Sequence, residues 1–194
     1  MKKVLAIGGA ALDTIITYED METLIHEKSD STQSYLLLEE GAKIEVTGQK
    51  YYSGGGATNA AVSLSMMGHD VTLFCKLGKD PIGQQVLEEV HSFGIDTSLI
   101  RYSSERGTAS SFVIPSLKGD RVLFAYRGAN TTLLKEDLPL QEIANADFIY
   151  VTSLSQESAA RLPEIAAHAQ ANNTFVAVNP GISQIARTSY CSKV

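Results

Sequence analysis

Strand-like and helix-like segments alternate along most of this sequence, and that order restricts the chain to a few folds. The strands are short apolar runs that end at a glycine or a turn, and capping residues open or close the helices between them. The predicted strands cover residues 4–7, 71–76, 98–102, 148–152 and 174–178, and the predicted helices 57–67, 81–93 and about 153–171. This alternation predicts an α/β fold, with a largely parallel sheet covered by helices on both faces.

Two helix starts carry specific signals. Asp80-Pro81 is an N-cap followed by proline at the first helical position. Ser153-x-x-Gln156 fits a capping box for the helix that runs to about residue 171.

Three further stretches contain strand signals without helices between them. They lie at about residues 14–18, 35–52 and 108–126, and the last contains a hairpin turn at residues 116–120. Residues 19–34 are polar without a clear period and predict a loop. Because these strands do not fit the parallel layer, we expect a small separate sheet.

Composition narrows the class of protein. A chain of 194 residues with 44% hydrophobic and 20% charged residues is typical of one globular domain. The net charge of −6 and the scattered Lys and Arg argue against a nucleic acid or an anionic membrane as partner. No apolar run approaches the ~20 residues that cross a membrane.

The start of the chain and the cysteines bear on its compartment. Residues 1–12 superficially resemble a signal peptide, but the apolar run is short and no cleavage site follows, so a buried first strand is the better interpretation. Cys75 and Cys191 lie far apart and form no C-x-x-C pair. We therefore expect a reduced, cytoplasmic setting.

A triple glycine stands directly before the first predicted helix, in Gly54-Gly55-Gly56-Ala57-Thr58-Asn59. One interpretation is a flexible turn. The segment fits neither a dinucleotide fingerprint, which needs glycine where Asn59 stands, nor a P-loop. The other interpretation is a binding site, because glycines let a ligand hydroxyl approach backbone N–H groups and an Asn amide both donates and accepts. Asp13 would lie on the same rim, so the pattern suits a polyol better than a phosphate.

The glycine segment resembles the first signature of the ribokinase (PfkB) carbohydrate kinase family. Residues 54–61, Gly68 and Gly78 match that signature in order and spacing. Further similar motifs are the opening at residues 7–13, Gly78-Lys79-Asp80-Pro81, Gly128-Ala129-Asn130 and Val178-Asn179-Pro180. The resemblance covers residues 3 to about 184 and implies a Rossmann-like α/β domain with a β-sheet lid.

The resemblance also implies an activity and a site. Family members phosphorylate sugars or nucleosides with ATP and Mg²⁺. The implied substrate residues are Asp13, the glycines Gly54, Gly55 and Gly56, and Asn59, with Asn130 and Arg127 at the border of the pocket. For Asn130 a turn-stabilising role is an alternative, and for Arg127 a solvated surface charge is the alternative.

The sequence departs from the family in one respect. It contains neither the Gly-x-Gly-Asp motif of the family's anion hole and general base nor its Asn-x-x-Glu motif linked to Mg²⁺. We therefore assign no catalytic or metal residue, and expect residues 1–194 to form the N-terminal, substrate-and-lid part of a kinase domain. ATP and Mg²⁺ are expected to serve the complete enzyme and to bind poorly to this chain alone.

Alternatives remain for the function, and the assembly is open. The leading hypothesis is a sugar kinase, with a nucleoside kinase of the same family close to it. A non-catalytic sugar-binding protein is a third reading. Since small sheets are rarely stable alone, we expect a homodimer joined lid to lid.

Overall fold

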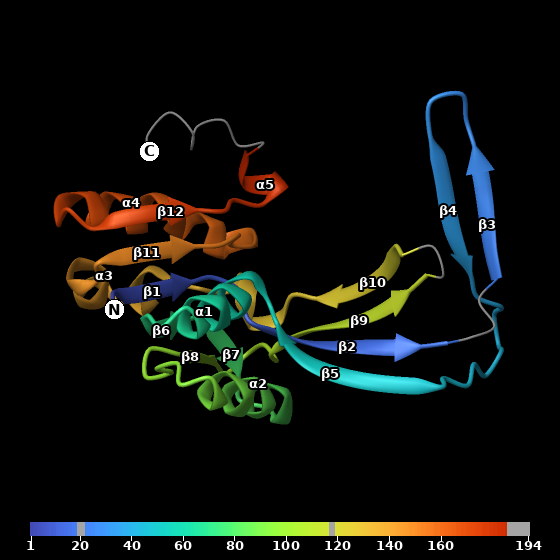
Figure 1. Cartoon of the computed structure of the whole chain (residues 1–194), viewed down its shortest axis with the longest axis horizontal. Helices are drawn as coiled ribbons and strands as arrows, with labels where there is room; N and C mark the ends of the chain where they lie inside the picture. Colours follow the sequence, from blue (N-terminus) through green and yellow to red (C-terminus); the bar gives the residue numbers. More distant parts are fainter. Residues whose placement is uncertain (19–21, 117–118, 186–194) are drawn as a thin grey trace.

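The centre of the protein is an all-parallel sheet of four strands in the order β12-β11-β1-β6, at the left of Figure 1. The computed structural model describes residues 1–18, 22–116 and 119–185. The strands are β1 (Lys3–Ile7), β6 (Asp70–Phe74), β11 (Phe148–Val151) and β12 (Phe175–Val178). This arrangement confirms the largely parallel layer that the sequence predicts.

Helices cover both faces of this sheet, and β1 shows how the sequence directs them. Val4 and Ala6 point into one apolar core, whereas Leu5 and Ile7 point into another, as alternate residues of a strand must. The first core is closed by α1 (Gly56–Met66) and α2 (Pro81–Ser92), and the second by α3 (Leu140–Asn145) and α4 (Leu162–Ala171). The prediction of helices on both faces is therefore confirmed.

A second four-stranded sheet, which we call the lid, extends away from the α/β body (Figure 1). Its order is β10-β9-β2-β5, with β2 (Ala11–Thr17), β5 (Gly48–Gly54), β9 (Ala109–Pro115) and β10 (Arg121–Tyr126). β2 pairs in parallel with β9 and antiparallel with β5. The lid thus grows directly out of β1, because only residues 8–10 separate β1 from β2.

The region before β5 differs from the prediction of a loop at residues 19–34 and a strand from 35 toward 46. Instead, β3 (Glu22–Glu27) and β4 (Thr32–Leu37) form a hairpin that projects from the far end of the lid (Figure 1). The loop prediction was wrong because a hairpin exposed on both faces leaves no apolar alternation in the sequence. β4 does not continue to residue 46, since a turn follows in which Ala42 N–H donates to Glu39 O (3.3 Å) and Gly41 has φ 82°.

Two strands of the body are shorter than predicted. The strand expected at 71–76 divides at Cys75, where β6 ends and β7 (Lys76–Gly78) leaves β1 to pair with β8 (Arg101–Ser103). The strand expected at 98–102 starts only at Arg101, because residues 97–100 form a turn closed by Ile100 N–H and Thr97 O (3.1 Å).

The two predicted helix starts have opposite outcomes. The Asp80 cap of α2 is confirmed: its carboxylate accepts from Gly83 N–H (2.8 Å), and Pro81 occupies the first turn. The Ser153 capping box is wrong, because residues 156–161 form a 3₁₀ helix, η3 (Gln156–Arg161), and α4 begins only at Leu162. Pro163 explains the late start, since proline is tolerated in the first turn of a helix but disrupts its interior.

Short elements complete the chain. They are η1 (Gly128–Thr131), η2 (Lys135–Asp137) and α5 (Ile182–Ile185). Among the described residues, no helix has both the length and the apolar character needed to cross a membrane.

Candidate functional site

The predicted site lies where two turns meet at the carboxyl end of β1. The β1–β2 turn comprises residues 8–10, and the glycine turn comprises Gly54, Gly55 and Gly56 between β5 and α1. Ala57 N–H at the start of α1 donates to Gly9 O (3.1 Å), which ties the two turns together.

Each glycine of the glycine turn faces a different neighbour at a distance that excludes a side chain. A Cβ on Gly54 would collide with the Asp13 carboxylate, and a Cβ on Gly55 would lie 2.8 Å from Ala10 Cα. A Cβ on Gly56 would lie 2.8 Å from Thr152 Cβ at the end of β11. Gly55 also has φ 95°, which favours glycine. Three segments of the protein therefore converge here, and the glycines are required for that packing whether or not a ligand binds.

Asp13 lies in β2, at the root of the lid. Its Oδ1 accepts a 2.5 Å hydrogen bond from Ser111 Oγ of β9, its partner across the parallel ladder. Ser111 is buried, so its hydroxyl fixes the orientation of the carboxylate. The sequence analysis missed Ser111, because only the register of β2 with β9 brings these residues together across 98 positions.

Asn59 stands in the first turn of α1, and its side chain is exposed. Its backbone N–H donates to Gly55 O (3.0 Å) and its carbonyl accepts from Ser63 Oγ (2.9 Å). Among the described residues, none forms a hydrogen bond with the side-chain amide of Asn59. Its amide is therefore free for a ligand at the end of the helix that carries the glycine turn.

Asn130 and Arg127 belong to the segment around η1, and their side chains bind protein atoms. The Asn130 amide makes two hydrogen bonds with the backbone of Ala10. The Arg127 guanidinium donates to Ser155 Oγ (3.0 Å) in the loop after β11, and Arg127 is exposed. The structure thus brings Asp13, the glycine turn and Asn130 to the β1–β2 turn, while Arg127 contacts a different loop.

A separate polar cluster joins the lid to α2. The Asp80 carboxylate accepts from Thr108 N–H (2.7 Å), Thr108 Oγ1 (2.7 Å) and Gly83 N–H. Gly78 N–H in turn donates to Thr108 Oγ1 (2.8 Å). Burial raises the pKa of Asp80, but the hydrogen bonds from Thr108 and Gly83 outweigh it, so the pKa lies below its ordinary value. Since β9 begins at the next residue, this cluster anchors the base of the lid.

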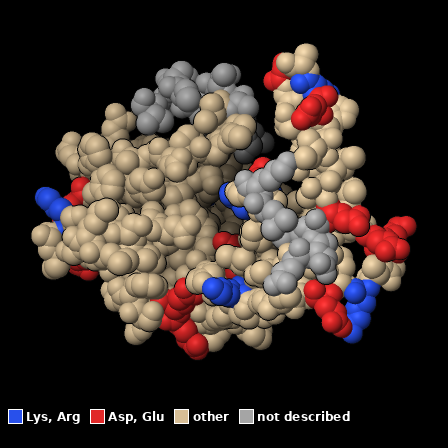
Figure 2. Space-filling model, turned by 45° about the vertical axis from the view of Figure 1, so that its right-hand side comes forward, with Lys and Arg blue, Asp and Glu red and all other residues tan. Residues whose placement is uncertain are grey.

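Among the residues that the structure describes, the remaining reactive groups do not form a second centre. Burial raises the pKa of the Cys75 thiol to about 12, so the reactive thiolate is not populated near neutral pH. Among the described residues, no three His, Cys, Asp or Glu side chains are placed to hold a metal ion. Figure 2 shows a hollow between the lid and the body, and the described Lys, Arg, Asp and Glu residues are scattered over this face without forming a basic patch.

A parallel sheet whose carboxyl edge carries an oriented carboxylate, a glycine turn and a β lid is typical of α/β proteins that bind a small molecule there. The chain belongs to the pfkB family of carbohydrate kinases, whose family model matches residues 2–192. The resemblance noted in the sequence is therefore confirmed at the level of the family.

The curated relatives of this chain include a ribokinase and a ribose-1-phosphate kinase. The chain is 34% identical over 103 residues to a ribokinase of Staphylococcus aureus, covering 52% of this chain and 34% of the relative. It is 25% identical over 139 residues to an ATP-dependent ribose-1-phosphate kinase of Halopiger xanaduensis, covering 72% and 47%. The chain thus spans about a third of the first of these relatives and about half of the second.

Solved structures share the fold. The crystal structure of Sa239 matches with a TM-score of 0.77 at 25% identity, covering 94% of this chain and 55% of that one. Arabidopsis thaliana ribokinase complexed with ribose and ATP matches with a TM-score of 0.73 at 17% identity, covering 91% and 53%. At 17% identity the second likeness establishes the fold alone.

Proposed function

We propose that this chain forms the sugar-binding part of an ATP-dependent carbohydrate kinase of the pfkB type, which phosphorylates a sugar hydroxyl. The main support for the proposal is the Asp13 carboxylate. The buried Ser111 hydroxyl orients it, and it packs against Gly54, where a side chain would collide with it. A carboxylate held in this way accepts hydrogen bonds from ligand hydroxyls without first having to be ordered.

The other proposed contacts complement that carboxylate. The exposed Asn59 amide both donates and accepts, as a hydroxyl does. Gly54, Gly55 and Gly56 keep side chains away from the backbone on this rim. We keep Arg127 and Asn130 at the border of the pocket, where their side chains bind Ser155 and Ala10 in this structure.

The phosphate donor is proposed from relatives. An Arabidopsis thaliana ribokinase is complexed with ribose and ATP, and a Cryptococcus neoformans ribokinase with ADP. The described residues of this chain do not fit a metal–nucleotide site, because they contain no cluster of three metal-binding side chains and the sequence has no Gly-x-Gly-Asp motif. We therefore assign no described residue to ATP or Mg²⁺, and propose that the chain alone does not turn over ATP.

A nucleoside kinase is the second candidate, and one feature favours it. Ile15 and Val113 are cross-strand partners on the lid face that carries Asp13, and both are half-buried. A nucleobase would offer these side chains an apolar surface that a free sugar lacks.

Calorimetric titration of residues 1–194 with ribose, fructose, inositol and adenosine tests both candidates. We expect one of these compounds to bind, and Asp13→Ala and Asn59→Ala each to weaken it by about 5- to 150-fold, as the loss of about 1–3 kcal/mol implies. Asp70→Ala removes an exposed carboxylate at the opposite end of the sheet and should leave the affinity unchanged. Unchanged affinity in both site variants would remove Asp13 and Asn59 from the site.

We further propose that the protein is a homodimer joined through the lid. Tyr51, Phe112 and Phe124 form a row with Thr14 on the lid face opposite Asp13, and are 49%, 49% and 54% exposed. Such an aromatic row on one sheet face is the kind of surface that a partner covers.

A further inference from the structure

The amide of Asn130 is paired with the backbone of one residue. Ala10 N–H donates to Asn130 Oδ1 (3.1 Å), and Asn130 Nδ2 donates to Ala10 O (3.0 Å). The Asn130 amide satisfies both the N–H and the carbonyl of Ala10 only when its oxygen faces the N–H and its nitrogen faces the carbonyl. Ala10 is fully buried, so these bonds replace the water that its backbone has lost.

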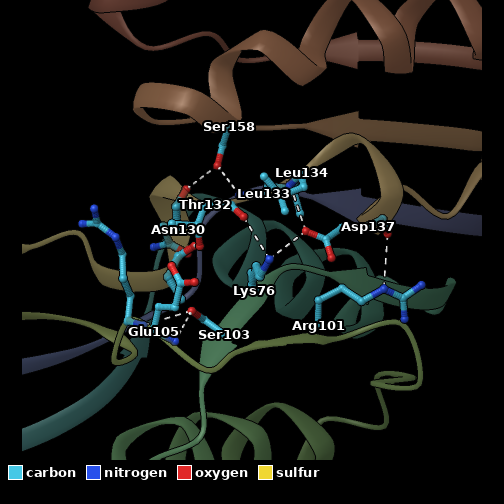
Figure 3. Close-up of polar contacts among 12 residues, drawn as sticks. Lys76, Arg101, Ser103, Glu105, Asn130, Thr132, Leu133, Leu134, Asp137 and Ser158 are labelled. Atoms are coloured by element: carbon cyan, nitrogen blue, oxygen red, sulfur yellow. Dashed lines mark hydrogen bonds and ion pairs between the residues drawn. The ribbon is translucent and has the colours of Figure 1, made fainter.

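The segment that carries Asn130 is itself held in place from two sides (Figure 3). Ser158 Oγ donates to Asn130 O (2.8 Å) and accepts from Leu133 N–H (2.8 Å). Lys76 Nζ donates to Thr132 O (2.9 Å) and to the Asp137 carboxylate (2.7 Å).

The Lys76–Asp137 pair is nearly buried, with side chains 10% and 16% exposed. A buried pair of this kind fixes its neighbours strongly, because either charge left alone would be costly. Asn130 therefore projects from a rigid support rather than from a flexible loop.

Ala10 in turn supports the proposed sugar site. The glycine turn rests on it, since a Cβ on Gly55 would lie only 2.8 Å from Ala10 Cα. β2 begins at the following residue and carries Asp13. A shift of Ala10 would therefore move both the glycine turn and the carboxylate.

We propose that Asn130 is a positioning residue, which fixes the β1–β2 turn through Ala10 and thereby sets the glycine turn and Asp13. This inference rests on the proposed sugar site. Asn130 acts on the sugar through the protein, because its amide oxygen and one of its amide N–H groups are directed at Ala10.

Asn130→Asp gives this role a distinctive signature. The ionised carboxylate still accepts from Ala10 N–H, but it sets an oxygen against Ala10 O, where the amide had a donor. The protonated carboxyl offers one donor and one acceptor and restores both bonds. Partial burial and the facing carbonyl should raise the pKa of this introduced carboxyl above the ordinary value of about 3.9, so we expect the recovery at mildly acidic pH.

The experiment measures the affinity of residues 1–194 for the best-binding compound among ribose, fructose, inositol and adenosine, from pH 8 to pH 5. For Asn130→Asp we expect about tenfold weaker binding than wild type at pH 8 and less than about threefold weaker binding at pH 5. The wild-type protein keeps Arg127, whose carbonyl accepts from Asn130 N–H (3.2 Å), and the Lys76–Asp137 pair on the same segment, and its own trend with pH is subtracted. Asn59→Asp is the matched control: its carboxyl is exposed, so its affinity should not recover above pH 5.

A second readout does not need a sugar. Hydrogen exchange of the Ala10 amide, expressed as a protection factor, should fall in Asn130→Ala, which removes the acceptor of that N–H. Ser158→Ala leaves the Asn130 amide intact but loosens its support, and should lower both Ala10 protection and affinity at all pH values. This variant keeps the test decisive if Asn130→Asp does not fold at pH 8.

The opposing outcomes are distinct. Affinity that is lost equally at every pH, with Ala10 protection unchanged, would show that Asn130 contacts the sugar and would overturn the inference. Wild-type affinity in Asn130→Asp at pH 8 would overturn it as well. If the wild-type protein binds none of the compounds, the proposed function fails, and Ala10 protection alone then decides whether Asn130 holds the turn.

Discussion

Replacing Gly54 with alanine should reduce sugar affinity while leaving the fold intact. Gly54 is the last residue of β5 and does not have a positive φ, so alanine adds no backbone strain there. The added methyl group meets the Asp13 side chain instead, with its Cβ 2.6 Å from Asp13 Cγ and 3.1 Å from Oδ1. The substitution therefore tests the position of one carboxylate.

The magnitude follows from these distances. Carbon atoms in contact lie about 3.5–4.0 Å apart, so the Asp13 carboxyl group must move by about 1 Å or rotate. Either change breaks the 2.5 Å bond from Ser111, whose buried hydroxyl then lacks an acceptor, at a cost of about 1–3 kcal/mol in the free energy of unfolding. The displaced carboxylate would also lose the bonds that we propose it makes to the sugar, which should lower affinity by about 5- to 150-fold.

Calorimetry with the bound sugar and urea unfolding measure the two effects separately. Gly48→Ala is the matched control, because Gly48 begins the same strand and an added Cβ would meet Thr17 Oγ1 at an ordinary 3.4 Å. We expect Gly48→Ala to bind like wild type. Equal affinities of wild type and Gly54→Ala would refute the reasoning, since the carboxylate could then not be both displaced and required.

Two other features give predictions of their own. Thr108→Val removes the hydroxyl that links Asp80 to Gly78, and should lower the free energy of unfolding at pH 7 by about 1–3 kcal/mol in urea titrations. The folded-state pKa of Asp80 is lowered, so its ionised form stabilises the fold above the ordinary pKa of about 3.9. The difference in the free energy of unfolding between wild type and Asp80→Asn should therefore disappear as the pH falls through the lowered pKa. A difference that persists at lower pH would contradict this prediction. For the lid dimer, light scattering should give two subunits for wild type and one for Phe124→Glu, whereas a wild-type monomer at high concentration would count against the dimer.

The body of the fold could be predicted because its signals are local. A strand buried on both faces is recognised in the sequence as a continuous apolar run. The start of α2 is predicted by two adjacent residues alone, Asp80 and Pro81. The capping box at Ser153 failed for an equally local reason, since Pro163 prevents a continuous helix through that position. The β3–β4 hairpin was missed because it is exposed on both faces and its pairing leaves no apolar period.

The site was predictable only in part, because its geometry depends on register. Asp13 and the glycine turn stand out as residues, but Ser111 has no local pattern and becomes visible only when β2 pairs with β9. The three glycines illustrate the same limit. Their number suggested close approach of a ligand, whereas their packing against Asp13, Ala10 and Thr152 already requires them.

The location of Asp13 in the lid has a consequence for how the site works. Asp13 and Ser111 are neighbours in one sheet, so their bond persists in any motion that moves the lid as a unit. Gly55 rests on Ala10 of the body, and the Asp80–Thr108 cluster ties the start of β9 to α2. Motion of the lid must therefore bend the chain within a few residues of these two anchors. The carboxylate lies three residues beyond Ala10 and close to that bend, so its displacement in such a motion would be small, whereas the far strands would move most. In the proposed sugar site, an acceptor at this point would stay in place in any motion that bends the lid there.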